Sequence, residues 1–444
     1  MDGPWLSQMA CALLQFLDSE KCERVGGRVR RRRLARPVAY ATGTGIDVSE
    51  NQISAARRRL PYGTFCVQAA EEMELTGTFE YIVLSDTLSL AADIQRVLTN
   101  LHKVTAPETR LLINCASSMW RPVYFLAAKL GLREQQVESS WLTRNDIENL
   151  LNLTSWESIT TSARILIPCP LFGLDVLANR LLSPFLPWFC LCFFCVARPR
   201  QRDRGKPMRV SIAVPARNEA GTIEALITRL PCLRAGTEVI FVEGESTDLT
   251  WEEIQRVSVV YPDRSIKAVR QPGHGKGDAI RAALQIATGE IFIILDADLT
   301  VPPEELSKFY AAIASGHCEF ANGVRLVYPT GKEMRFFNLC ANKFFSVAFS
   351  WLLGQPVKDT LCGTKALNCT DYKRIVENRS YFGSFDPFGD FDLLFGSGRL
   401  NLKIADIPVR YQERTYGSTN IRRWRDGALL LRMLYFAAWK LKFI

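Results

Sequence analysis

The sequence predicts an α/β protein with two domains. Beyond residue 208, four short β-rich runs each end in polar or glycine-rich residues, and helical patterns follow. This alternation predicts a parallel sheet with crossover helices. The chain has 444 residues, which excludes a single small module, since domains typically hold roughly 100 to 200 residues. The arginine-rich stretch 198–207 has the composition of a linker and divides the chain.

The four runs can be placed in order along the C-terminal part. The strands are expected within MRVSIAVPARNE, TEVIFVEGESTD, SIKAVRQPGHGKGD and GEIFIILDADLT, and the helices within TIEALITRL, TWEEIQRV and DAIRAALQIAT. In such sheets, ligands bind beyond the carboxyl ends of the strands. The polar or glycine-rich residues that end the four runs all fall at this edge, so we expect them to converge on one site.

The charge of the chain is concentrated in two short runs. Hydrophobic residues make up 48% and charged residues 23%, as in an ordinary globular protein, and the formal net charge is +9. One run is the linker, and the other spans 24–36. This second run is either simply solvated or attracted to anionic lipid headgroups. No basic face interleaved with aromatic residues accompanies it, so we expect no nucleic-acid partner.

The chain has 13 cysteines, and three of them, Cys190, Cys192 and Cys195, share an apolar run. With no second CxxC and no histidine ligand nearby, they are expected to be buried small hydrophobic residues and not zinc ligands. We therefore expect the cysteines to be reduced and the protein to be cytosolic. No signal peptide is evident, because no basic region precedes the apolar patch near the N-terminus.

Three apolar stretches bear on membrane association. Residues 181–197 contain two prolines and fall short of the roughly 20 residues that a spanning helix needs, so we expect a turn and a buried strand. Residues 335–354 and 427–444 show the spacing of amphipathic helices. Each is either a helix facing the core or one lying in a membrane interface, with its cations near the headgroups.

Asp296 and Asp298 stand one residue apart where the last apolar run ends. On an extended segment, one carboxylate can reach a hard cation while the other orients water or a ribose hydroxyl. Two carboxylates in one site repel each other unless a cation or hydrogen bonds compensate. Mg²⁺ or Mn²⁺ bridging a diphosphate is the expected partner. Aspartates at strand ends also cap turns and helices, and this alternative stays open.

Six motifs in order give the region from Arg209 to about Ile444 a family resemblance. They are VPARNE, VEGESTDLT, GHGKGDAIR, DAD, DTLCGTKAL and RTYGSTNIRRW. The region resembles an inverting family 2 glycosyltransferase, particularly the polyprenyl-phosphate branch that includes dolichyl-phosphate mannose and glucose synthases. The resemblance implies a glycosyltransferase-A type nucleotide-binding domain. It also implies metal-dependent transfer of a sugar from a nucleoside diphosphate to a polyprenyl phosphate at a membrane.

The resemblance assigns the donor side of the site. Asp296 and Asp298 would take the metal and the diphosphate. Glu243 stands where an aspartate is common in the family. Glutamate keeps the carboxylate as a hydrogen-bond acceptor, on a longer side chain. Lys276 would lie near the nucleotide, and the alternative is a solvated loop lysine. The residues implied for nucleotide-sugar binding are Pro215, Ala216, Arg217, Glu219, Glu243, Asp248, Lys276 and Asp296.

The resemblance also assigns the acceptor side. Asp390 and Asp392 match the second acidic pair, and Asp392 is the better match to the acceptor-side position. An acceptor phosphate needs no general base, whereas a hydroxyl acceptor would need Asp392 to take its proton. Arg414 and Arg422 or Arg423 are candidates for neutralising phosphates. The branch often has Gly-x-Ser-Lys where this chain has GSTN; the lysine is missing, and Arg422 and Arg423 could substitute.

Residues 40–197 resemble a class I S-adenosylmethionine-dependent methyltransferase domain, through GIDVSENQISAARRRL, FEYIVLSDTLSL and WLTRNDIENLLNLTSWES. The resemblance implies that Asp47 binds the ribose hydroxyls of the cofactor. The first strand and its glycine-rich loop are missing upstream, and Ala69 replaces an expected aspartate. We therefore expect an incomplete Rossmann-like domain, which is a degenerate methyltransferase. S-adenosylmethionine binding is doubtful, and the expected role of the domain is structural, as a platform for the transferase.

The expected organisation is a poorly defined basic segment at 1–39, the methyltransferase-like domain at 40–197, the linker at 198–207 and the glycosyltransferase domain at 208–444. The expected partners are a nucleotide-sugar donor, a lipid acceptor and a membrane surface. The expected location is the cytoplasm, peripheral on the inner face of the membrane. An active methyltransferase with an appended sugar transferase, a hydroxyl acceptor and a noncatalytic membrane scaffold remain as alternatives.

Overall fold

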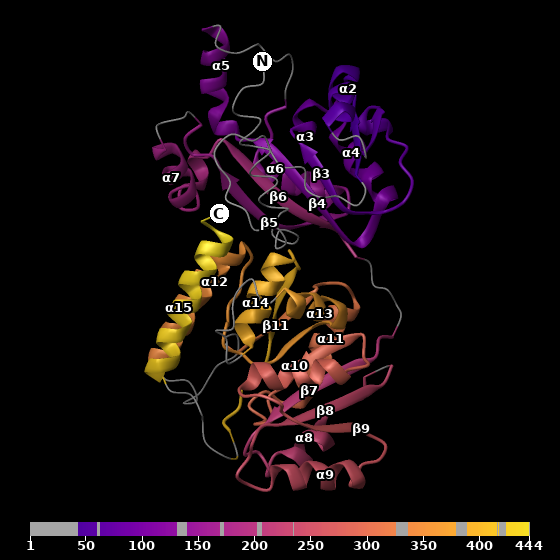
Figure 1. Cartoon of the computed structure of the whole chain (residues 1–444), viewed down its shortest axis with the longest axis vertical. Coiled ribbons are helices and arrows are strands. Elements are labelled where there is room, and N and C mark those ends of the chain that lie inside the picture. The colour runs from indigo at the N-terminus through magenta and orange to yellow at the C-terminus, as the bar shows by residue number, and fades with distance from the viewer. Residues whose placement is uncertain are drawn as a thin grey trace. The chain divides into compact units, whose positions relative to one another are not determined.

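A computed structural model describes residues 43–59, 63–130, 140–168, 173–201, 207–233, 235–325, 336–378, 389–414, 416 and 423–443. The basic run 24–36 and Arg422 lie outside these residues, and only the backbone of Arg423 is described. The structure divides into two compact units (Figure 1). The first holds the described residues up to Arg200 together with Phe443, and the second holds those from Gln201 to Lys442. Each unit is described by itself.

The first unit contains a two-stranded parallel sheet, β1-β2, and a four-stranded sheet of order β3-β4-β6-β5. In the larger sheet β3 and β4 are parallel, while β6 runs antiparallel to both β4 and β5. The strands are β1 Thr44–Asp47, β2 Thr64–Val67, β3 Phe79–Ser85, β4 Thr105–Ala116, β5 Trp156–Arg164 and β6 Cys192–Pro199. The helices are α2 Glu50–Arg59, α3 Thr87–Leu90, α4 Ile94–Leu101, α5 Arg121–Lys129, α6 Arg144–Leu153 and α7 Leu174–Leu181, with 3₁₀ turns η1 Ala70–Glu72, η2 His102–Val104, η3 Ser118–Trp120 and η4 Pro187–Phe189.

The apolar stretch 181–197 contains the predicted turn and buried strand. The turn η4 precedes β6, and every residue of β6 is buried. Cys190, Cys192 and Cys195 are also buried. Burial raises the pKa of the Cys190 thiol to about 11 and raises those of Cys192 and Cys195 as well, because an apolar setting disfavours the thiolate. These thiols therefore behave as small hydrophobic side chains.

The second unit is built on a seven-stranded sheet of order β13-β11-β12-β10-β7-β8-β9. The four strands predicted from the sequence, β7 to β10, are parallel to their neighbours within that set. β12 runs antiparallel to β10 and β11, so the complete sheet is mixed. The strands are β7 Val210–Ala216, β8 Thr237–Glu243, β9 Ser265–Arg270, β10 Ile291–Ile294, β11 Phe320–Val324, β12 Lys365–Asn368 and β13 Ile404–Pro408.

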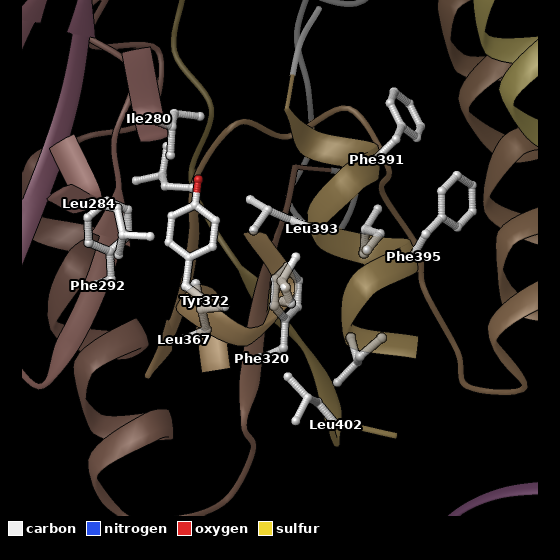
Figure 2. Packing of buried hydrophobic residues seen from close by; sticks show 14 of the residues in the cluster. Ile280, Leu284, Phe292, Phe320, Leu367, Tyr372, Phe391, Leu393, Phe395 and Leu402 are labelled. Atoms are coloured by element: carbon white, nitrogen blue, oxygen red, sulfur yellow. The ribbon is translucent and has the colours of Figure 1, made fainter. Parts of the chain in front are cut away.

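Both faces of this sheet are covered, which explains the continuous apolar sequence of β10. Ile291 and Ile293 pack into one hydrophobic cluster, while Phe292 and Ile294 pack into the other. Strands buried on both faces are apolar at every position. Figure 2 shows part of the second cluster, where Tyr372 faces Phe292 with ring centroids 5.1 Å apart. This packing fixes the strand end that carries Asp296.

The helices of the second unit include the two segments predicted to be amphipathic, which form α12 and α15. They contact each other and contribute Phe349, Leu430 and Met433 to the core. Phe344 and Tyr435 are exposed, so apolar side chains also point away from that core. No helix in the described part of the chain could cross a membrane. The helices are α8 Ile223–Arg229, α9 Thr250–Val260, α10 Lys276–Ile286, α11 Leu306–Ala314, α12 Phe336–Leu353, α13 Cys369–Glu377, α14 Asp390–Arg399 and α15 Arg423–Leu441, with a 3₁₀ turn η5 Pro303–Glu305.

Candidate functional site

The two aspartates of the DAD motif follow β10 at its carboxyl end, as the sequence predicts. Asp298 has two functions in the structure. Its Oδ1 accepts hydrogen bonds from the backbone N and Oγ1 of Thr300, at 3.1 and 2.8 Å, and so caps the turn in which Leu299 has a φ of 58°. Its Oδ2 faces Arg414. The capping role and the site role therefore coexist on one carboxylate.

Lys276 connects the DAD motif to the second acidic pair. Its Nζ lies 2.6 Å from Oδ1 of Asp296 and 4.0 Å from Oδ2 of Asp390. Gly275, with a φ of 85°, precedes α10 and brings the lysine to the start of the helix. Burial alone would lower the pKa of Lys276, but the charges of Asp296 and Asp390 outweigh it and raise the pKa. The lysine is therefore a fixed cation in the site and not a solvated loop residue.

Arg414 connects two further carboxylates. Its Nη2 lies 2.8 Å from Oδ2 of Asp298, and its Nη1 lies 2.9 Å from Oε1 of Glu219. Glu219 is buried, and burial raises its pKa to about 7, although Arg414 lowers it in part. Asp298 adds to the rise because like charges repel. The arginine thus compensates a concentration of negative charge that the protein buries at this edge of the sheet.

Gly363 lets the chain pass directly beside the Lys276–Asp296 pair. A Cβ at this position would lie 2.0 Å from Oδ2 of Asp296 and 2.4 Å from Nζ of Lys276, closer than real contacts allow. The sequence motif DTLCGTKAL contains this glycine, but sequence reasoning gave it no role. The available signal was a glycine two residues before a lysine in this short motif; the structure shows that the lysine is buried.

That buried lysine is Lys365, which sequence reasoning also missed. Its side chain is fully buried, and its Nζ lies 3.6 Å from Oδ1 of Asp390. It also donates to the side chain of Asn322 at 3.3 Å. A buried ammonium group is stable only when paired, so Asp390 is held between Lys276 and Lys365.

Asp390 and Asp392 do not share one environment. Asp390 faces the two lysines, whereas Asp392 lines a pocket with Arg281, Tyr372 and Arg399 among α10, α13 and α14. Both residues belong to the first turn of α14, where positions two apart point roughly 200° apart. The structure therefore places Asp390, and not the preferred Asp392, beside the DAD motif.

The donor-side loops are joined by hydrogen bonds. Asn218, in left-handed conformation with a φ of 56°, accepts a hydrogen bond at Oδ1 from the backbone N of Thr247 at 2.7 Å. Asp248 Oδ2 accepts from the backbone N of Ala220 at 3.3 Å. Glu243 is buried, and its Oε1 accepts from the backbone N of Ser246 at 2.6 Å. These bonds fix the loops after β7 and β8 against each other.

The remaining donor-side residues lie at the end of β7. Ala216 is buried, Pro215 is half-buried and Arg217 is exposed just beyond the strand. All three are adjacent in sequence to the loop that carries Glu219. Of the acceptor-side arginines, Arg414 is the one whose side chain the structure describes.

A second missed network is built on Asp359, the first residue of DTLCGTKAL. Arg325 donates to both of its carboxylate oxygens, at 2.8 and 2.9 Å, and Asn342 donates to Oδ1 at 3.0 Å. Burial would raise the pKa of Asp359, but these partners hold it below its ordinary value. The network ties the end of β11 to α12 and supports the segment that carries Gly363.

The predicted cofactor residue of the first unit, Asp47, ends β1 and is exposed. Its Oδ1 accepts a hydrogen bond from the backbone N of Ser49 at 2.7 Å. Among the described residues β1 pairs with β2, and these two strands form a sheet of their own. Asp47 is therefore at a strand end, as expected, on a sheet separate from the four-stranded one.

The carboxylates of the DAD motif fit a divalent cation by their chemistry. Asp296 and Asp298 offer oxygen ligands only, the type that Mg²⁺ and Mn²⁺ prefer. No cluster of three or more potential metal ligands was found among the described residues. Mg²⁺ commonly uses one or two protein carboxylates together with phosphate oxygens, so two aspartates are sufficient.

Comparisons with known proteins find similarity in both units. Residues 211–373 match the family model "Glycosyl transferase family 2", and residues 33–153 match "Methyltransferase domain". The dolichol-phosphate mannosyltransferase of Pyrococcus furiosus is 34% identical over 225 residues, which cover 48% of this chain and 60% of the relative. An undecaprenyl-phosphate 4-deoxy-4-formamido-L-arabinose transferase of Aeromonas hydrophila is 31% identical over 112 residues, 24% of this chain and 34% of the relative. The chain thus spans less than two thirds of these relatives.

One similar solved structure is glucosyl-3-phosphoglycerate synthase from Mycobacterium tuberculosis, in complex with Mn²⁺, UDP and glucosyl-3-phosphoglycerate. The matched region covers 54% of this chain and 81% of that one. The identity is 19% and the TM-score is 0.39. The same enzyme with Mg²⁺ and UDP gives 17% identity and a TM-score of 0.40.

Proposed function

We propose that this chain, whose residues 211–373 form a family 2 glycosyltransferase domain, transfers a sugar from a nucleoside-diphosphate sugar to a polyprenyl phosphate, with inversion and with a divalent cation. The observation that carries the proposal is the cluster at the carboxyl ends of β7 and β10. There Asp296 pairs with Lys276, and Asp298 pairs with Arg414. Carboxylates that can hold a cation, together with fixed cationic side chains, suit a nucleoside-diphosphate leaving group.

The leaving group dictates the chemistry that the residues must perform. When the anomeric carbon is attacked, negative charge accumulates on the nucleoside diphosphate. Mg²⁺ or Mn²⁺ held by Asp296 and Asp298 would neutralise part of that charge. Lys276 and Arg414 are positioned cations that would stabilise the remainder. The loops after β7 and β8, with Glu243 and Asp248, would hold the nucleoside.

The acceptor is proposed to be a lipid phosphate. Two relatives carry dolichol phosphate or undecaprenyl phosphate in their names, and such an acceptor is already anionic and needs no general base. Arg422 and Arg423 are retained as proposed phosphate contacts. For a hydroxyl acceptor, Asp390 replaces Asp392 as the proposed base, because Asp390 shares Lys276 with Asp296.

For the first unit we propose a structural role beside the transferase. Supporting this, the sequence ahead of Asp47 does not show the expected strand followed by a glycine-rich loop, and among the described residues β1 pairs with β2 in a sheet of two strands. Calorimetric titration of the full chain with S-adenosylmethionine tests the point. A flat titration is expected, and measurable binding heat would support the alternative of an active methyltransferase.

The proposed location of the protein is peripheral, on the inner face of a membrane.

A donor screen tests the proposed reaction. Purified full-length protein would be incubated with Mn²⁺ or Mg²⁺, UDP- or GDP-sugars and a short polyprenyl phosphate, and the product read by mass spectrometry. A lipid-phosphate-sugar product is expected. Donor hydrolysis without transfer would contradict the lipid acceptor and direct attention to hydroxyl acceptors and Asp390.

A further inference from the structure

Helix α7 of the first unit has the opposite polarity to an ordinary surface helix. Its acidic residue, Asp175, is buried and 5% exposed, whereas Leu174 and Leu177 are 66% and 55% exposed. In a soluble helix the apolar face turns inward and charged residues face water. Here the carboxylate faces the protein and the leucines face outward.

The inward polar face of α7 is held by specific hydrogen bonds. Asn179 Oδ1 accepts from the backbone N atoms of Leu166 and Ile167, both at 2.7 Å, and its Nδ2 donates to the carbonyl oxygen of Ile167 at 2.8 Å. Ser183, fully buried, donates to the carbonyl oxygen of Asn179. Asp175 and Asn179 are four residues apart and so share one face of α7, and Ser183 follows just after the helix ends. The orientation of α7 is therefore fixed by its sequence.

Helix α5 adds a second set of outward apolar side chains. None of its residues is buried, although its sequence is RPVYFLAAK, and Phe125 and Leu126 are 67% and 57% exposed. Beyond α7, Phe185 and Trp188 are 60% and 74% exposed. We call the six residues Phe125, Leu126, Leu174, Leu177, Phe185 and Trp188 the α5–α7 surface.

The two parts of this surface arise from the same end of the four-stranded sheet. Ala116, the last residue of β4, pairs with Cys192, the first residue of β6. The segment with α5 follows β4, and the segment with α7 and η4 precedes β6, so both leave the sheet together (Figure 1). Trp120 Nε1 donates to the carbonyl oxygen of Phe189 at 3.0 Å and joins them. The exposed apolar residues thus belong to one region of the unit.

In the described segments that form the α5–α7 surface, the exposed charged residues have one sign. In the segments 117–130 and 173–191, the exposed charged residues are Arg121, Lys129 and Arg180, and the acidic residue Asp175 is buried. Cations at the border of an apolar surface complement the anionic headgroups of a bilayer. Tryptophan suits the membrane interface because its ring is apolar and its N–H can bind water, and phenylalanine adds apolar area to the same contact.

We propose that the α5–α7 surface inserts into the interface of an anionic lipid bilayer and anchors the first unit there. The proposal rests on the reversed polarity of α7, the exposed side chains of Phe125 and Leu126 on α5, and the basic border. It does not depend on the proposed transferase activity. It also gives the methyltransferase-like unit a task that requires no cofactor.

The test is binding of the full chain to vesicles of phosphatidylcholine and phosphatidylglycerol, measured by flotation. The double variant Leu177→Ser/Trp188→Ser removes two exposed side chains, and the partition coefficient is expected to fall at least about tenfold for each. The control is Leu90→Ser/Leu153→Ser, which removes two leucines of the same unit that are 61% and 62% exposed outside the surface. The control should bind like the wild type.

A second measurement uses a variant that keeps the surface apolar. Brominated lipids should quench the fluorescence of the wild-type chain, and Trp188→Phe should lose part of that quenching while still binding vesicles. The proposal is overturned if the wild type does not float with vesicles, or if both double variants bind equally well. It is also overturned if Leu177→Ser/Trp188→Ser dissociates a dimer in sedimentation velocity without changing vesicle binding, since the surface would then join two copies of the chain.

Discussion

Arg414 and Asp298 are 116 residues apart in the sequence, yet Nη2 of the arginine lies 2.8 Å from Oδ2 of the aspartate. The same guanidinium reaches Glu219, on the loop after β7. A single side chain therefore joins the segment after β13 to the ends of two neighbouring strands. Because the arginine has a planar fork of donors, it can bind two carboxylates at once, which a lysine cannot do with the same geometry.

Replacing Arg414 tests this connection. Arg414→Ala is expected to lower kcat/KM for sugar transfer by about 100-fold or more, because a fixed cation beside the leaving group is removed. Arg414→Lys should recover only part of the loss. Arg229→Ala is the matched control, since Arg229 pairs with Glu304 on the exposed surface. Wild-type kinetics for Arg414→Ala would show that the arginine only supports the fold.

The two acidic residues of α14 should behave differently. Asp390→Asn disturbs the group held between Lys276 and Lys365, and transfer is expected to fall at least about tenfold. Asp392→Asn should stay within about threefold of the wild type, because Asp392 lines the pocket among α10, α13 and α14 instead of pairing with Lys276 and Lys365. Steady-state kinetics on both variants decides the point. Loss of activity in Asp392→Asn alone would return the acceptor-side role to Asp392.

This pair shows why part of the site could not be predicted from the sequence. The stretch GDFDLLF, residues 389–395, shows that Asp390 and Asp392 stand two positions apart, but the phase of the helix decides which of them faces the site. That phase is set by packing, in which Phe391 and Phe395 enter the core. By contrast, Asp296 and Asp298 were predictable, because an apolar run buried on both faces of a sheet has to end at its carboxyl edge.

The C-terminal part of the sheet was harder to predict than β7 to β10. β12 spans four residues and begins with Lys365, a residue type that rarely lies buried in a strand. Its partners, Asn322 and Asp390, are distant in the sequence, so no local pattern shows that the lysine is paired. Tertiary contacts therefore override the local preference, and the antiparallel strand remained unpredicted.

The close approach at Gly363 gives a third prediction. Gly363→Ala places a methyl group where Oδ2 of Asp296 and Nζ of Lys276 now lie, so these groups must move. We expect at least a tenfold loss of transfer with little change in the midpoint of thermal unfolding, since the glycine has an ordinary φ. Gly236→Ala is a contrasting control: it has open space and a φ of 101°, so it should lower stability and spare activity. Unchanged transfer in Gly363→Ala would refute the proposed tight contact.

The opposite end of the sheet provides a prediction about pH. Glu238 accepts hydrogen bonds from Ser211 and Thr288 and pairs with Lys267 at 2.7 Å. Burial would raise the pKa of Glu238, but these partners lower it to about 2. A carboxyl group with a lowered pKa stabilises the fold above its unfolded pKa, and this contribution is lost as the pH falls toward 2.

Glu238→Gln should therefore reduce the free energy of unfolding by about 1 to 3 kcal/mol at pH 7, with a smaller difference at pH 3. Urea denaturation at both pH values measures the effect. Glu252→Gln, an exposed residue of α9, is the control and should change stability little. An equal loss at pH 7 and pH 3 would mean that the charge of Glu238 contributes nothing.

The central claim is that the DAD motif holds the donor diphosphate during sugar transfer, and Asp296→Asn tests it most directly. The variant would be compared with the wild type in the polyprenyl-phosphate assay, with product quantified by mass spectrometry in Mn²⁺ and in EDTA. The account predicts a lipid-phosphate-sugar product for the wild type in Mn²⁺, none in EDTA, and a loss of at least about 1,000-fold in the variant. Undiminished transfer by Asp296→Asn would contradict the account.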